Sequence, residues 1–178
     1  MKKLLLHTGQ KLRFLSVFLC FLLCFPSCSY TKKDPLEYRS RGFRATVSVE
    51  LESFSFDAVF HISPPDSEGG VSFKVDFISP NSLSGLSVVQ SRDNFKILLD
   101  GKEYISENST VFSELDIGRA VTALSPTEPV RSIKSNGEHT IVSVGDYTIY
   151  IDPDTSLPIK SVNESLGLTV TVHELVFN

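Results

Sequence analysis

Apolar and polar residues alternate along the chain from Phe43 to Phe77, and this pattern constrains the fold more than any other feature. The alternation fills residues 43–51, 54–62 and 71–77, with a Pro- and Gly-rich turn over residues 64–70 before the third run. Successive side chains of a β-strand point to opposite faces, so a period of two gives each strand one apolar face and one wet face. The pattern therefore predicts three consecutive half-buried strands.

Shorter runs of the same kind follow. Further strands are predicted over residues 86–90, 94–99, 102–106, 130–135, 140–144, 147–151, 157–163 and 168–177. Asp100-Gly101 is predicted to form the tight turn that joins two of these strands. Both residues of such a two-residue turn need positive φ angles, and Asp-Gly is a preferred pair for them. In the last strand the apolar residues change parity after Val172. This change predicts a β-bulge near His173-Glu174.

A helical period replaces the period of two over residues 113–124. Leu115, Val121 and Leu124 fall near one face of this segment, and Pro126 ends it. About ten strands with one convincing helix leave no crossover helices for parallel pairing. The predicted fold class is therefore α+β, with a dominant, curved and largely antiparallel sheet.

The apolar face of this sheet is large for its cover. The first three strands carry the phenylalanines Phe43, Phe54, Phe56, Phe60, Phe73 and Phe77. Monomers tolerate exposed apolar patches of roughly a few hundred Å², and a helix of about 12 residues spans only about 18 Å. The sheet must close on itself, pair with another chain or keep an apolar hollow that takes a lipid. Alternatively, the sheet curls tightly and the phenylalanines are ordinary core.

The first 27 residues have the features of a secretory signal peptide. Residues 1–13 carry four basic side chains and no acid, residues 14–25 are almost wholly apolar, and Pro26-Ser27 comes next. This apolar stretch of 12 residues is too short to cross a bilayer core of about 30 Å comfortably. An uncleaved membrane anchor is the alternative.

The positions of the cysteines indicate how the exported chain is held. Cys20, Cys24 and Cys28 all lie in the first 28 residues, so no disulfide can cross-link the rest of the chain. Phe25-Pro26-Ser27-Cys28 resembles the bacterial lipobox, in which the cysteine is lipidated, and lipidation of this kind gives stable anchoring. Ordinary cleavage nearby is the alternative. The predicted organisation is a lipoprotein signal peptide (1–27), a tether (28–41) and one domain (42–178), held on the extracytoplasmic face of a cell membrane.

The charge and the motifs exclude several classes of function. From Cys28 onward, 13 Lys and Arg stand against 21 Asp and Glu, a net charge of −8. Phosphate attraction dominates nucleic-acid affinity, so nucleic acid is set aside as a partner. Catalytic and phosphate-binding motifs are absent, and His61, His139 and His173 are expected at the surface without acidic or cysteine partners. The chain is expected to be no enzyme and to need no metal or cofactor.

Four features, one of them the predicted helical stretch over residues 113–124, resemble a known family, and the other three are short segments. These are Asp100-Gly101-Lys102-Glu103-Tyr104, the stretch from Tyr147 to Lys160 with its Asp-Pro-Asp-Thr turn and Leu-Pro, and the terminal Val176-Phe177. In this order they resemble the LolA/LolB-like lipoprotein-carrier superfamily, whose relatives include mycobacterial lipid-binding lipoproteins and the sigma-factor regulator RseB. Over residues 42–177 the resemblance implies an unclosed antiparallel β-barrel around an apolar cavity, with the helix as a lid.

Two functions are open to such a chain. In the first, a membrane-tethered, non-enzymatic lipoprotein holds a lipid or an acylated protein in the apolar cavity. The expected cavity residues are Phe56, Phe60, Phe73, Val75 and Phe77, and the expected lipid attachment site is Cys28. In the second, the sheet is packed solid and the chain is a sensory or regulatory lipoprotein, as the RseB resemblance allows. It would then bind an envelope protein through residues 63–70 and 125–131.

Overall fold

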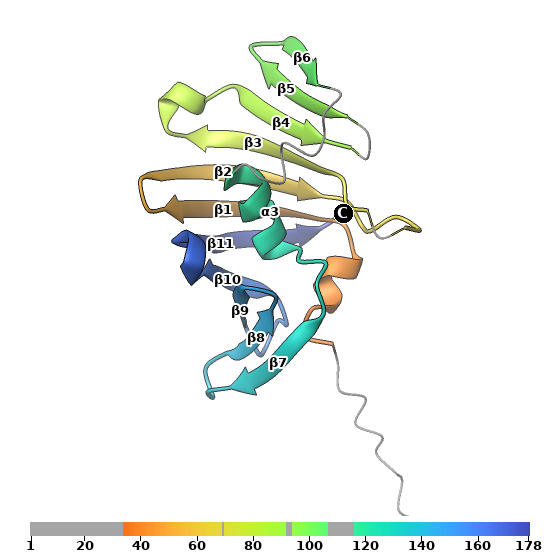
Figure 1. Ribbon diagram of the computed structural model, residues 1–178, viewed down its shortest axis with the longest axis vertical. Helices are drawn as coiled ribbons and strands as arrows, with labels where there is room; N and C mark the ends of the chain where they lie inside the picture. The colour runs from red at the N-terminus through yellow and green to blue at the C-terminus, as the bar shows by residue number, and fades with distance from the viewer. Residues whose placement is uncertain (1–33, 69, 92–93, 107–115) are drawn as a thin grey trace, which may run out of the picture. The chain divides into compact units, whose positions relative to one another are not determined.

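One curved sheet of eleven antiparallel strands dominates the computed structural model, which describes residues 34–68, 70–91, 94–106 and 116–178 (Figure 1). Its strand order is β6-β5-β4-β3-β2-β1-β11-β10-β9-β8-β7. The strands are β1 (Phe43–Leu51), β2 (Phe54–Ile62), β3 (Phe73–Ser79), β4 (Leu86–Gln90), β5 (Phe95–Leu99), β6 (Lys102–Ser106), β7 (Val130–Ser135), β8 (Thr140–Val144), β9 (Tyr147–Ile151), β10 (Pro158–Asn163) and β11 (Leu168–Phe177). The described helices are α3 (Asp116–Leu124) and the short 3₁₀ turns η1 (Glu37–Ser40), η2 (Asn81–Leu83) and η3 (Glu164–Leu166).

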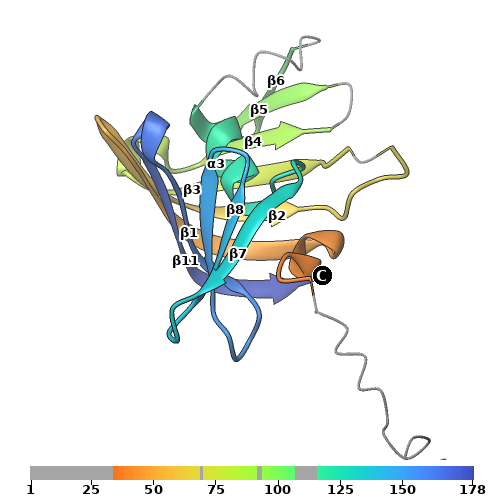
Figure 2. The ribbon, with the colours of Figure 1, turned by 60° about the horizontal axis from the view of Figure 1, so that its bottom comes forward.

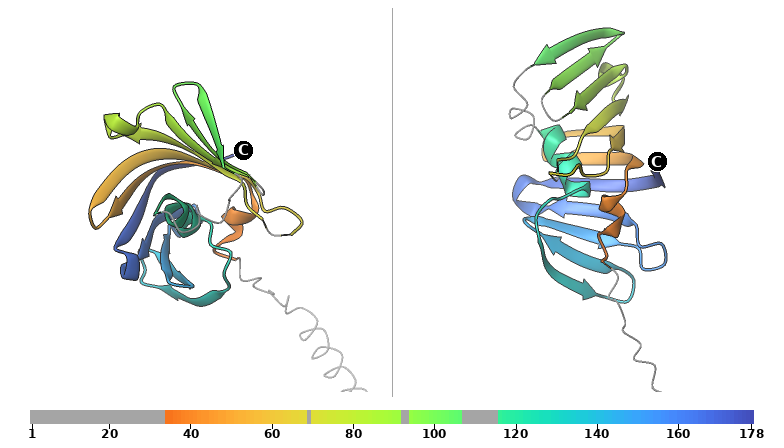
Figure 3. Two further views of the ribbon diagram at one scale, coloured as in Figure 1. Left: turned by 45° about the horizontal axis from the view of Figure 1, so that its top comes forward. Right: turned by 90° about the vertical axis from the view of Figure 1, so that its right-hand side faces the viewer.

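The sheet bends around α3 without closing. Its end strands are β6 and β7, which do not pair with each other. Figures 2 and 3 show β7, β8 and β9 curling back on one side of the helix, while β3 to β6 extend away on the other. The predicted α+β fold with an unclosed antiparallel sheet is confirmed. The predicted helix over 113–124 is seen from Asp116, and its first three residues lie outside the described part of the chain.

The core lies on the inner face of the sheet, where the alternating apolar residues gather. Phe43, Ala45, Val47 and Val49 of β1 are fully buried, and the polar residues between them point outward. The apolar side of α3 packs against β9, β10 and β11. Its buried residues are Gly118, Ala120, Val121, Ala123 and Leu124. Alternation in the strands and the helical period of α3 therefore build one common core.

The predicted bulge in the last strand is confirmed. Thr46 of β1 lies opposite Glu174, whereas its neighbour Val47 lies opposite Val172, so His173 is the extra residue of β11. An extra residue reverses the parity of everything after it. Leu175 and Phe177 can therefore pack against the core together with Val172.

The described part of the chain begins at Asp34, within the segment predicted as tether. Leu36 is fully buried and Tyr38 is 3% exposed, with its ring edge-on to Phe43 at 5.8 Å. The Tyr38 hydroxyl donates a 2.7 Å hydrogen bond to the carbonyl oxygen of Leu124, at the end of α3. A helix leaves its last carbonyl groups without partners in the helix itself. The N-terminal segment thus supplies a partner for the end of α3.

Replacing Tyr38 with Phe tests this contact. Burial raises the pKa of Tyr38 far above its ordinary value, so the hydroxyl remains a donor at every accessible pH. The variant leaves a buried carbonyl group without its partner, which costs about 1–3 kcal/mol of unfolding free energy. Urea denaturation measures the loss. Tyr104→Phe, at a tyrosine that is 56% exposed, is the matched control and should leave stability unchanged. Equal stability of the two variants would contradict the assignment.

Candidate binding surface on the inner face of the sheet

The five residues predicted to line a cavity lie together on the inner face of β2 and β3. Phe60 pairs with Val75, and the rings of Phe56 and Phe77 are 5.1 Å apart. These four side chains are buried, with Phe77 the most exposed at 6%. Phe73 is partly buried and packs against them. The five residues form a continuous apolar wall within the core.

This wall continues onto three strands that the sequence prediction did not include in the site. Val75 pairs with Val88 of β4, Val88 with Ile97 of β5, and Ile97 with Tyr104 of β6. Exposure rises along the row, from 3% at Val88 to 56% at Tyr104. We call Leu86, Ile97, Leu99 and Tyr104 the arm surface. It is the accessible extension of the buried wall.

Among the described residues, the cover over the inner face is confined to one side. α3 has nine residues, a length of about 14 Å. It packs against β9, β10 and β11, and the views of Figure 3 show the β4–β6 arm reaching beyond it. Leu99 in the arm is 41% exposed. The described part of the chain therefore has a covered half and an accessible apolar half on the same face.

The arm surface could have been found from the hairpin at Asp100-Gly101. Their φ angles are 48° and 78°, as the predicted tight turn requires. A two-residue turn fixes the pairing of its strands, here Ile97 with Tyr104. Leu99 lies two residues from Ile97 in β5 and so shares its face. The turn and the alternation of the two strands it joins place Ile97, Leu99 and Tyr104 on one face. The prediction did not use this signal.

The predicted lipid attachment site, Cys28, lies outside the described residues, and so do residues 1–27 and the first part of the tether. In the described part of the chain, no helix combines the length and apolar character that a membrane span requires.

A separate pocket of about 410 Å³ lies beside η1. Three segments meet there: the N-terminal segment, the β2–β3 loop and the segment between α3 and β7. Its lining residues are Asp34, Leu36, Glu37, Arg39, Ser40, Pro65, Val71, Ser125, Pro126 and Thr127. We call it the η1 pocket. It brings together the two loops predicted from the sequence to bind a protein partner, residues 63–70 and 125–131.

On the outer face, Asp57 of β2 accepts hydrogen bonds from Ser48 Oγ at 2.6 Å and from Ser79 Oγ at 2.7 Å. These bonds stabilise the carboxylate and lower the pKa of Asp57. His173 Nε2 lies 2.7 Å from the same Ser48 Oγ. Because Ser48 gives its proton to Asp57, its oxygen accepts from the histidine. This arrangement does not activate a serine nucleophile, which needs a histidine that takes its proton.

A second outer-face cluster surrounds Asp76 of β3. His61 Nε2 lies 3.1 Å and Lys74 Nζ 2.8 Å from its carboxylate, and Ser87 donates to it. Burial acts to raise the pKa of Asp76, but the bonds from Lys74 and Ser87 outweigh it and lower the pKa. The prediction that the histidines lack acidic partners is wrong for His61. The reason is that His61 and Asp76 meet only through the register of β2 and β3, which spacing in the sequence does not give.

Within the described ranges, no three His, Cys, Asp or Glu side chains gather closely enough to hold a metal ion.

Neither family models nor curated protein sequences match the chain. Several solved structures are similar to it in fold. An uncharacterized conserved protein from Thermus thermophilus is similar with 19% identity and a TM-score of 0.50, over 82% of this chain and 84% of its own. MucB is similar with 15% identity and a TM-score of 0.45, over 80% of this chain and 56% of its own. A LolA-superfamily protein from Nitrosomonas europaea is similar with 7% identity and a TM-score of 0.41, over 81% of this chain and 92% of its own.

The likeness is one of fold. At identities below 20%, the shared property is the curved sheet, and ligands or partners do not transfer with it.

The depressed pKa values of Asp57 and Asp76 predict how stability depends on pH. A carboxylate with a lower pKa in the folded state stabilises the fold above its ordinary value of 3.8, and this contribution is lost as the pH falls through the folded-state pKa. Unfolding free energy should therefore drop below about pH 4. In the Asp57→Asn, Asp76→Asn double variant the drop should be shallower. Urea titrations between pH 2 and pH 7 measure it, and an unchanged slope would contradict the assignment.

Proposed function

We propose that the protein is a non-enzymatic binding lipoprotein, anchored through Cys28 on the extracytoplasmic face of a cell membrane. Its inner sheet face holds the acyl chain of a lipid or of an acylated envelope protein. Phe56, Phe60, Val75 and Phe77 form the buried wall of this site, and Phe73 lies where the wall becomes accessible.

The observation that carries the proposal is the arm surface. Tyr104 and Leu99 are 56% and 41% exposed, although they continue a face that is buried at Val47 and Val49 of β1 and at Ala58 and Phe60 of β2. Covering apolar surface contributes about 25 cal/mol per Å². An acyl chain laid along β4 to β6 would gain this energy without needing a hydrogen-bond partner from the protein. The leader and Cys28 support a location where such ligands are abundant.

Substitutions on the two faces of the arm test the acyl site. Leu99→Gln and Tyr104→Gln should each weaken binding of a fluorescent fatty acid to the full chain roughly tenfold, the effect of losing about 1.4 kcal/mol of apolar contact. Ile105→Gln is the matched control. Ile105 is the residue after Tyr104, is 61% exposed and points to the opposite face, so its variant should bind normally.

Native mass spectrometry of protein purified gently from membranes gives a second measurement. We expect a bound mass that disappears in Leu99→Gln. A clean unliganded mass, together with no fatty-acid binding by the unsubstituted chain, would contradict the acyl site.

The membrane anchor is tested at Cys28. Cys28→Ser should abolish incorporation of labelled palmitate and release the protein from the membrane fraction, because lipidation needs the thiol. Cys20→Ser and Cys24→Ser are the matched controls and should retain the label. Labelled Cys28→Ser protein would contradict this assignment.

A protein-binding regulator is the second candidate, favoured by the η1 pocket. There Pro65 and Val71 of one loop meet Ser125 and Thr127 of the other. Cross-linking that recovers one membrane protein in equal amount, from a preparation without lipid, would support this candidate over the first.

A further inference from the structure

The walls of the η1 pocket are fixed by hydrogen bonds between distant parts of the chain. Arg39 Nη1 donates to the carbonyl oxygen of Pro126 at 2.8 Å, next to the bond from Tyr38 to Leu124. The side chain of Asp34 accepts from the backbone N–H of Leu36 at 2.9 Å. Leu36 and Pro126 are themselves buried. The pocket is therefore a preformed feature of the fold.

One side of the pocket offers hydrogen-bond donors that the fold leaves unused. Ser125 lines the pocket, is only 8% exposed, and its hydroxyl makes no hydrogen bond among the described residues. The hydroxyl lines the pocket and is therefore available to a ligand there. Arg39 also lines the pocket and uses one N–H on Pro126, which leaves further donors on its guanidinium group. A hydroxyl and a guanidinium group together suit a phosphate.

The rim carries the opposite charge. Asp34 and Glu37 both line the pocket, and neither forms an ion pair with any described residue. Their carboxylates suit an ammonium group. A purely cationic segment would also meet the positive charge of Arg39, whereas a ligand with both signs can satisfy both sides.

We propose that the η1 pocket binds the zwitterionic phosphoethanolamine headgroup of a phospholipid. Arg39 and Ser125 take the phosphate, Asp34 and Glu37 take the ammonium group, and Leu36 and Val71 contact the carbons between them. A volume of about 410 Å³ lies within the usual range of small-molecule sites, about 300–1,000 Å³.

The position of the pocket favours a lipid as the source of this group, and this step rests on the anchor proposed above. Asp34 lies six residues after Cys28, a span of at most about 20 Å. A lipid on Cys28 would therefore keep the pocket close to the headgroups of the bilayer.

Calorimetric titration of the full chain with soluble glycerophosphoethanolamine tests the chemistry. We expect saturable binding, with glycerophosphate, inorganic phosphate and ethanolamine each at least roughly tenfold weaker. In the Asp34→Asn, Glu37→Gln double variant, glycerophosphoethanolamine should fall to the affinity of glycerophosphate. The amide oxygen introduced by Asp34→Asn still accepts from the Leu36 N–H, so the fold is preserved. Ser125→Ala should weaken every phosphate probe.

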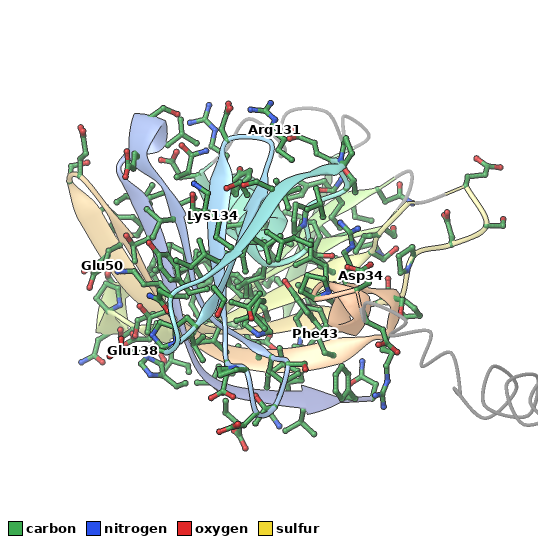
Figure 4. All side chains as sticks on the ribbon, turned by 90° about the horizontal axis from the view of Figure 1, so that it is seen from below. Asp34, Phe43, Glu50, Arg131, Lys134 and Glu138 are labelled. Atoms are coloured by element: carbon green, nitrogen blue, oxygen red, sulfur yellow. The ribbon has the colours of Figure 1, made fainter. Side chains whose placement is uncertain are left out.

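Glu138→Gln is the matched control for loss of a carboxylate. Glu138 lies at the β7–β8 turn, well apart from Asp34 in Figure 4, and does not line the pocket. This variant should bind like the unsubstituted chain.

Several results would overturn the proposal. They are no saturable binding of glycerophosphoethanolamine, equal affinity for inorganic phosphate, unchanged affinity in the double variant, or displacement of the probe by an oligolysine peptide.

A binding measurement with lipid vesicles tests whether a phospholipid is the source of the headgroup. The unsubstituted chain should prefer phosphatidylethanolamine over phosphatidylcholine vesicles, and the double variant should not. Failure of fatty-acid binding or of Cys28 labelling leaves the soluble titration intact, so the two proposals fail separately.

Discussion

The structure depends on covering the apolar inner face of a single curved sheet. β1 stands at the centre of the eleven strands, and its inward residues Phe43, Ala45, Val47 and Val49 are fully buried. Sheet curvature alone does not shield this face, and α3 supplies only nine residues of helix. Within the described ranges, the cover therefore ends partway across the sheet. The same shortage that exposes Leu99 and Tyr104 creates the surface on which the proposed acyl site rests.

The N-terminal segment belongs to this cover as much as α3 does. Leu36 and Tyr38 complete the core next to Phe43, and the Tyr38 hydroxyl holds the carbonyl end of α3. Arg39 continues this connection to Pro126. The segment that leads from the proposed anchor is thus joined directly to the helix that covers the core. It also forms one wall of the η1 pocket.

Much of the sheet was predictable because the alternation that specifies its strands can be read from residues that are neighbours in the sequence. Alternation gives the strands, and the parity change after Val172 gives the bulge at His173. The buried part of the site, from Phe56 to Phe77, is indicated by the same pattern. Contacts set by cross-strand register were not predictable in this way, as the pairing of His61 with Asp76 shows. The burial of Leu36 and Tyr38 was also missed, because two apolar residues in a polar stretch have no period to reveal them. The η1 pocket joins segments separated by about ninety residues, and no local pattern could indicate it.

The two proposed sites require different structural properties of the fold. Apolar contact is not directional, so an acyl site needs only a continuous surface, and a row of side chains with graded exposure from Val88 to Tyr104 provides one. A charged headgroup is recognised through hydrogen bonds whose strength depends on distance and angle. Its donors and acceptors must be held in place, and around η1 the bonds from Tyr38 and Arg39 do so across the chain. The loosely covered half of the sheet and the tightly fixed end near Asp34 therefore match the two kinds of group, tail and headgroup, that a membrane lipid combines.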